Sequence, residues 1–169
     1  MDSRSTVSPA GQLANVSAAL IAASTTSTSD ATEEHARLLA RLFEDLVVVG
    51  ADVAGLGRKV VSTTGEHGFE AALIAALEAA REDRVLVLDA GGPPVSAKLV
   101  LGMTAWPEHE CVAPGDRGIV NPRCFIVKRE AALVKANAKK FHGSRGFDEV
   151  VAGFDCSFIE GSDLAQLMR

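Results

Sequence analysis

The segment that most constrains the fold is a short apolar run that ends in an acid and two glycines. Residues 84–89 have the sequence Arg-Val-Leu-Val-Leu-Asp, and Ala90-Gly91-Gly92 follow. This run comes directly after Phe69 to Glu82, where apolar residues recur at helical spacing. A near-continuous apolar run after a helix is typical of a strand buried on both faces of a sheet. The sequence therefore predicts an α/β fold with a buried central sheet flanked by helices.

The neighbouring segments extend this pattern. Lys59 to Thr64 is rich in β-branched residues, which favour strands, so it predicts a βαβ unit with the helix and strand that follow. A further helix is expected to begin at Ser29-Asp30 and to continue through Leu46. Beyond Gly102 the expected elements are loops at Trp106-Pro107 and Ala113-Pro114-Gly115, a strand over Gly118 to Val127 interrupted near Pro122, a helix over Glu130 to Lys140 and a strand over Phe154 to Ile159.

The first residues of the chain are rich in Ser, Thr and Ala. Leu13 to Ala23 is apolar enough for a short helix but too short to span a bilayer. The nearly neutral start, with Asp2 against Arg4, is unlike a secretory signal. We therefore expect a partly ordered N-terminal arm over residues 1–24, a single domain over residues 25–169 and no membrane partner, with organellar import left open.

Charge and composition limit the classes of partner and site. The net charge is −5 and only 5% of residues are aromatic, so direct nucleic-acid binding is not expected. The three cysteines, Cys111, Cys124 and Cys156, are widely spaced with no CxxC. This spacing argues against both a disulfide framework and a zinc site, and it favours a reducing, cytoplasmic compartment. The cluster Glu108-His109-Glu110-Cys111 has metal-ligand residue types, but adjacent side chains diverge, so no metal site is predicted.

Three places could carry chemistry. Asp89 and the backbone N–H groups of Gly91 and Gly92 would lie at a sheet edge, where α/β proteins bind ligands. The glycines are equally consistent with a simple tight turn, and both interpretations stay open. Glu66-His67 precedes the long helix, where it is either an acid–base pair or, as we favour, a polar turn. Cys124 follows Arg123 and is expected to be a buried, unreactive thiol.

Taken together, these segments resemble the family of regulators of ribonuclease activity A (RraA-like), which also contains 4-hydroxy-4-methyl-2-oxoglutarate aldolases. The specific part is Val60 to Gly92, where the strand and glycine turn are close to the family's "RVLVVDGGG". The resemblance implies a swivelling β/β/α domain, assembled as a homotrimer. The matching segments are Thr26 to Ala31, Gly57 to Thr63, Gly68 to Ala80, Arg84 to Gly92, Gly118 to Val120 and, loosely, Lys139 to Glu149.

The same resemblance implies two functions. The aldolase branch uses an Arg-Asp pair, whereas here Arg123 is followed by Cys124. The first hypothesis is therefore a regulator that binds a protein of RNA decay, such as a ribonuclease or a helicase. The alternative is a Mg²⁺-dependent aldolase or oxaloacetate decarboxylase acting on a small keto-acid, with no cofactor expected otherwise. In that enzyme Arg123 would be the catalytic carboxylate clamp, and Asp89, Gly91 and Gly92 would bind the ligand.

Overall fold

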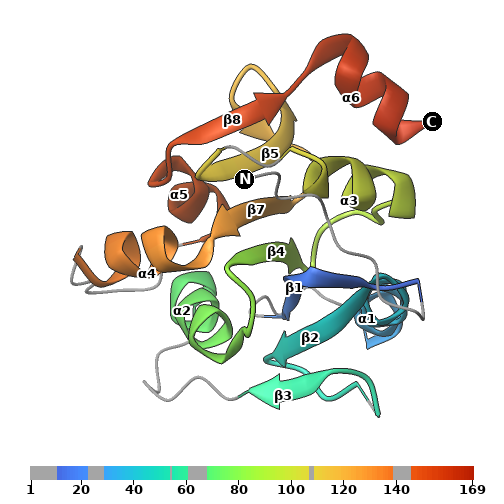
Figure 1. Cartoon of the computed structure of the whole chain (residues 1–169), viewed down its shortest axis with the longest axis vertical. Helices are drawn as coiled ribbons and strands as arrows, with labels where there is room; N and C mark the ends of the chain where they lie inside the picture. Colours follow the sequence, from blue (N-terminus) through green and yellow to red (C-terminus); the bar gives the residue numbers. More distant parts are fainter. Residues whose placement is uncertain (1–10, 23–28, 54, 61–67, 107–108, 139–145) are drawn as a thin grey trace.

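The computed structural model describes residues 11–22, 29–53, 55–60, 68–106, 109–138 and 146–169. Within these residues, one sheet of eight strands is packed between helices (Figure 1). The strands are β1 (Leu13–Ile21), β2 (Phe43–Val49), β3 (Arg58–Val60), β4 (Arg84–Asp89), β5 (Cys111–Asp116), β6 (Ile119–Val120), β7 (Cys124–Lys128) and β8 (Cys156–Ile159). The helices are α1 (Ser29–Leu42), α2 (Phe69–Ala79), α3 (Ala97–Thr104), α4 (Arg129–Ala138), α5 (Phe147–Ala152) and α6 (Gly161–Met168).

The sheet has the order β3-β2-β1-β4-β7-β5-β6, with β8 paired to β5. Strands β1 to β4 are parallel, β7 is antiparallel to both β4 and β5, and β8 runs parallel to β5. The predicted α/β class, with a buried central sheet flanked by helices, is confirmed. The predicted swivelling β/β/α arrangement is wrong, because the strands form a mixed, Rossmann-like sheet instead.

Two apolar cores lie on the two faces of the sheet. One packs α2, α4 and α5 against the sheet, and the other packs α1, α3 and α6 against the opposite face (Figure 1). Strand β4 contributes to both, since Val85 and Val87 face the first core while Leu86 and Leu88 face the second. All six residues of β4 are buried, so the strand predicted over residues 84–89 is confirmed.

The second central strand was not predicted. Leu13 to Ala23 was expected to be a helix within an N-terminal arm, but Leu13–Ile21 forms β1, which is paired on both sides in the middle of the sheet. Ala19 and Ile21 face one core, while Ala18 and Leu20 face the other. Burial on both faces removes the polar alternation that marks a strand, and the Ala-rich composition then resembles a helix.

The other predicted elements are mostly confirmed, with shifted bounds. Helix α1 ends at Leu42 and β2 begins at Phe43, so the expected continuation of the helix to Leu46 is wrong. The predicted loop Ala113-Pro114-Gly115 is also wrong, because these residues belong to β5. The remaining predictions place six elements correctly, namely strands β3, β6, β7 and β8 and helices α2 and α4. Of the strand predicted over residues 59–64, residues 61–64 lie outside the described residues.

A disulfide joins Cys111 of β5 to Cys156 of β8, contrary to the prediction from cysteine spacing. These residues are 45 positions apart in the sequence, but the parallel pairing of the two strands places them directly opposite each other. Their Cα atoms are 4.4 Å apart, which is within the range for a disulfide. The partnership is thus created by strand register and leaves no local pattern in the sequence. In the described part of the chain, no helix is both long and apolar enough to cross a membrane.

Candidate functional site

The sheet has a topological switch point between β1 and β4. From β1 the chain moves outward to β2 and β3, and it then returns to place β4 on the other side of β1. In open α/β sheets, ligands bind outside the carboxyl ends of the strands at such a point. Here those ends are Ile21 and Asp89, which are joined by a hydrogen bond from the Ala90 N–H to the Ile21 carbonyl at 2.8 Å. The candidate site therefore lies around Asp89.

The turn after β4 is closed by Asp89 itself. The Gly91 N–H donates to Asp89 Oδ1 at 3.0 Å, and the Gly92 N–H donates to the Asp89 carbonyl at 3.0 Å. Of the two interpretations of these glycines, the geometry favours the tight turn, since both N–H groups have an internal acceptor. In this conformation both N–H groups are already bonded within the turn, so they do not form the predicted cradle for an anion.

Arg123, from the segment between β6 and β7, covers the same carboxylate. Its Nε and Nη2 atoms both lie 2.7 Å from Asp89 Oδ2, and the Asp89 side chain is only 5% exposed. The backbone fixes this arrangement, because the Asp89 N–H donates to the Arg123 carbonyl at 3.0 Å. A Cβ on Gly92 would lie 3.0 Å from the Arg123 Cβ, so the glycine leaves the room that this side chain uses.

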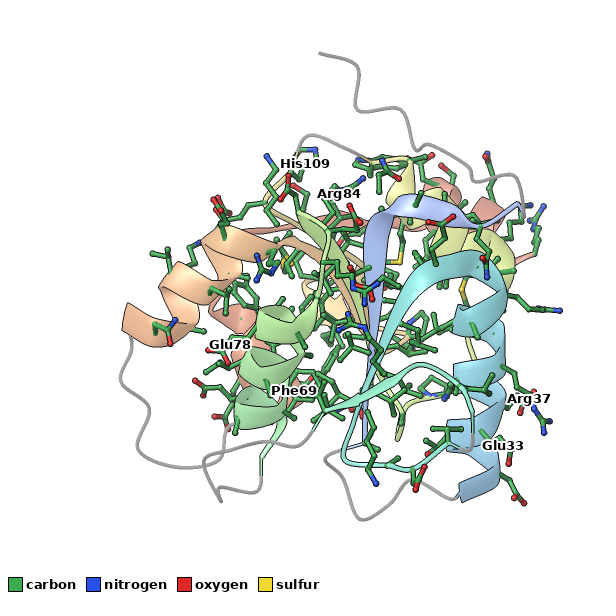
Figure 2. All side chains as sticks on the ribbon, turned by 60° about the horizontal axis from the view of Figure 1, so that its bottom comes forward. Glu33, Arg37, Phe69, Glu78, Arg84 and His109 are labelled. Carbon is green, nitrogen blue, oxygen red and sulfur yellow. A yellow bond between two sulfur atoms is a disulfide. The ribbon has the colours of Figure 1, made fainter. Side chains whose placement is uncertain are left out.

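Two residues at the start of α5 complete the surroundings of Arg123. Asp148 lies 3.6 Å from Arg123 Nη1 and has a 75% exposed side chain. The guanidinium carbon lies 4.5 Å from the ring centroid of Phe147, a cation–π distance. Phe147 in turn packs edge-on against Phe69 at the start of α2, which Figure 2 labels, with ring centroids 5.2 Å apart. The Arg123 guanidinium thus contacts one buried carboxylate, one exposed carboxylate and one aromatic ring.

The other side of the turn contacts a buried histidine of α1. His35 is 4% exposed, and its Nδ1 atom has no hydrogen-bond partner among the described residues. Burial lowers the pKa of His35, although the carbonyls of Pro93 and Ala90 and the charges of Glu34 and Asp89 act in the raising direction. The imidazole is therefore neutral at pH 7 and packs under the turn as an uncharged group.

A pocket of about 520 Å³ adjoins this site. Asp148, which pairs with Arg123, lines one part of it. The remainder of its lining is apolar or acidic: Gly118, Ile119, Val120, Val151, Ala152, Phe154, Asp155, Cys156 and Phe158. The pocket thus offers a partly apolar space next to the one arginine that anchors the turn.

The structure brings all four predicted site residues, Asp89, Gly91, Gly92 and Arg123, into one place. Cys124 is fully buried, as predicted, and burial raises the pKa of its thiol to about 12. Glu66-His67 lies outside the described residues, as does Glu108 of the acidic cluster. Sequence reasoning missed His35, Phe147 and Asp148, which carry no local motif and join the site only through tertiary packing.

No protein-family model and no curated protein matches the chain. Solved structures do match it in fold. A nucleotidyl transferase from Methanothermobacter has a TM-score of 0.65 and 15% identity, covering 90% of this chain and 89% of its own. The molybdopterin-guanine dinucleotide biosynthesis protein A from Archaeoglobus fulgidus has a TM-score of 0.63 and 11% identity, covering 90% and 96%.

A third similar structure holds ligands. The glucosyl-3-phosphoglycerate synthase from Mycobacterium tuberculosis, solved with Mn²⁺, uridine diphosphate and phosphoglyceric acid, has a TM-score of 0.54 and 17% identity. It covers 72% of this chain, which in turn covers 57% of the synthase.

These matches overturn the resemblance to the RraA-like family. What carried that resemblance was a buried strand ending in Asp and a glycine turn, a local pattern that more than one α/β fold contains. The expected RNA-decay partner, the keto-acid lyase activity and the homotrimer rested on that resemblance and fall with it. The chain instead has a mixed-sheet α/β fold similar to that of these solved structures, with Asp89 and Arg123 at its switch point.

Proposed function

We propose that this protein is a nucleotidyltransferase that uses a nucleoside triphosphate and a phosphate-bearing acceptor such as a sugar phosphate. The observation that carries the proposal is the position of the Asp89–Arg123 pair at the β1/β4 switch point. Two similar structures that are a cytidylyltransferase and a nucleotidyl transferase by name support it, since each covers 90% of this chain.

The proposed reaction is a nucleotidyl transfer, a substitution at the α-phosphorus of the nucleotide. An oxygen of the acceptor phosphate attacks the α-phosphorus of the nucleotide and forms a new P–O bond. The bond from that phosphorus to the oxygen bridging to the β-phosphate breaks, and pyrophosphate leaves. Such transfer depends mainly on positioning and on compensating the negative charge of the phosphates.

Arg123 is the residue that we assign to charge compensation. A guanidinium has five N–H donors, and two of its nitrogens here face Asp89. Its side chain remains 35% exposed, so the remaining donors can reach a phosphate oxygen. Asp89 would act as a positioning residue that orients the guanidinium, as a carboxylate partner commonly does.

The divalent ion of the mycobacterial synthase raises the question of a metal here. In this site Asp89 Oδ1 accepts the Gly91 N–H and Oδ2 accepts two Arg123 nitrogens. In this conformation a divalent ion resident in the protein would have to compete with Arg123 for the Asp89 carboxylate, and the proposed transfer is derived without one.

The first experiment is a binding and turnover screen on the full chain. Each of the four ribonucleoside triphosphates is tested by thermal shift and calorimetry, and pyrophosphate release is then followed with a panel of sugar phosphates. We expect at least one nucleotide to bind and Arg123→Gln to weaken that binding tenfold or more. A matched control is Arg37→Gln, because Arg37 pairs with Glu33 on the outer face of α1 (Figure 2).

The result that would overturn the proposal is clear-cut. If no triphosphate binds and no pyrophosphate forms in the screen, the site is not a nucleotidyltransferase site. If binding occurs but Arg123→Gln and Arg37→Gln behave alike, the nucleotide lies elsewhere.

The cytoplasmic location expected from the sequence stays a prediction. Persistence of the Cys111–Cys156 disulfide in cell extracts prepared with thiol blocking would count against it.

A further inference from the structure

The guanidinium of Arg123 lies between two carboxylates from different parts of the chain. Asp89, at the end of β4, contacts Nε and Nη2 at 2.7 Å, and Asp148, in the first turn of α5, lies 3.6 Å from Nη1. Two acids that converge on one point would repel each other without a cation between them. In many phosphate-handling sites that cation is a divalent ion held by one or two carboxylates and the substrate phosphates.

Arg123 is held by contacts along its whole side chain. The Asp89 carboxylate is buried, with Oδ1 accepting the Gly91 N–H and Oδ2 contacted by two Arg123 nitrogens. The arginine stem passes over Gly92, where a Cβ would meet it at 3.0 Å, and its head lies over the Phe147 ring. A hydrated Mg²⁺ or Mn²⁺ ion at Asp89 Oδ2 would have to displace this charge-assisted, two-point contact.

We propose that Arg123 is the resident cation of this site and occupies the place between Asp89 and Asp148 at which a divalent ion would otherwise bind. The free protein then holds no divalent ion at Asp89, and removal of the guanidinium exposes a two-carboxylate site that accepts one. This inference deepens the proposed function, because it assigns the charge that faces the substrate phosphates to the chain itself. The same inference makes Asp89 and Asp148 latent metal ligands.

The test is Mn²⁺ binding to the full chain without nucleotide, measured by electron paramagnetic resonance of free and bound Mn²⁺. Five proteins are compared: the wild type, Asp89→Asn, Arg123→Gln, Arg123→Gln combined with Asp89→Asn, and the control Arg37→Gln. We expect the wild type and Arg37→Gln to show no Mn²⁺ site that depends on Asp89. Arg123→Gln should gain one Mn²⁺ site, and the added Asp89→Asn change should abolish it.

Thermal unfolding gives a second readout. Saturating Mn²⁺ should raise the Tm of Arg123→Gln by about 5 °C, because a ligand that binds only the native state stabilises it. The wild type should show no such rise. Where Arg123→Gln proves too unstable to purify, Arg123→Lys is used as well. It keeps a positive charge and should remain without an Mn²⁺ site, whereas an ion bound beside the lysine would overturn the proposal.

Two outcomes of the Mn²⁺ binding measurements would also refute the inference. In the first, the wild type binds Mn²⁺ and Asp89→Asn removes that binding, so Asp89 is an ordinary metal ligand. In the second, folded Arg123→Gln gains no Mn²⁺ site, so the place is not suited to a divalent ion. Because nucleotide is absent from these measurements, their failure is distinguishable from failure of the nucleotide screen, which tests the transferase proposal.

Discussion

Loss of the Asp89 charge is predicted to destabilise the fold far more than loss of the Asp148 charge. Asp89→Asn keeps the shape of the side chain and an oxygen for the Gly91 N–H, but it leaves Arg123 without its close counter-ion. Two unit charges about 4 Å apart interact by about 4 kcal/mol at an effective dielectric constant near 20. Since the Arg123 side chain is 35% exposed and can regain water, we discount this to about 2 kcal/mol.

A cost of about 2 kcal/mol corresponds to a fall in Tm of about 4–8 °C for a chain of this length. Asp148→Asn is the matched control, because that carboxylate is 75% exposed and 3.6 Å from the guanidinium, so its loss should cost less than about 0.5 kcal/mol. Urea unfolding at pH 7 measures the free energy of unfolding of each variant. Equal costs for the two variants would refute the reasoning that burial makes the Asp89 pair the stronger one.

Three further predictions test other parts of the site and fold. Gly92→Ala should lower the free energy of unfolding by about 1–2 kcal/mol in urea, because the new Cβ presses on the Asp89 carbonyl oxygen and the Arg123 side chain. The control Gly146→Ala should be nearly neutral, because its Cβ meets nothing within 4 Å. Equal effects of the two variants would contradict the predicted crowding at Gly92. The lowered pKa of His35 means that the unfolded chain binds more protons below about pH 6.5, so stability should fall as the pH drops from there toward the folded-state pKa. His35→Gln should flatten that loss in urea titrations at pH 7.5 and 5.5, and an unchanged slope would exclude His35 as its source. Cys111→Ser with Cys156→Ser should cost about 2–4 kcal/mol, and thiol counting by mass spectrometry should find both thiols blocked in the wild type; free thiols there would contradict the bond.

The parallel half of the sheet was partly predictable from the sequence. Strand β4 and helix α2 have strong local patterns, a continuous apolar run and a helical stripe, and both were found. Strand β1 was missed because its Ala-rich, doubly buried sequence has no alternation. Strand β5 was missed because Pro114 and Gly115 indicate a loop, yet both residues pair within the sheet.

Part of the candidate site could be picked out from the sequence, whereas His35, Phe147 and Asp148 could not. Asp89, Gly91 and Gly92 are marked by the end of a buried strand, and Arg123 by its place before the next strand. Their pairing depends on β7 lying beside β4, which no local pattern encodes. The local turn motif resembled a family with another topology, and only the strand order distinguished the two.

The pairing of Asp89 with Arg123 also bears on how the protein folds. Asp89 closes the parallel half of the sheet, whereas Arg123, 34 residues later, belongs to the antiparallel extension that begins when β7 docks on β4. Separation of the two halves would leave a carboxylate and a guanidinium without their partners. The residues proposed to handle phosphate therefore also link the two halves of the sheet, and we expect these halves to unfold together as one cooperative unit.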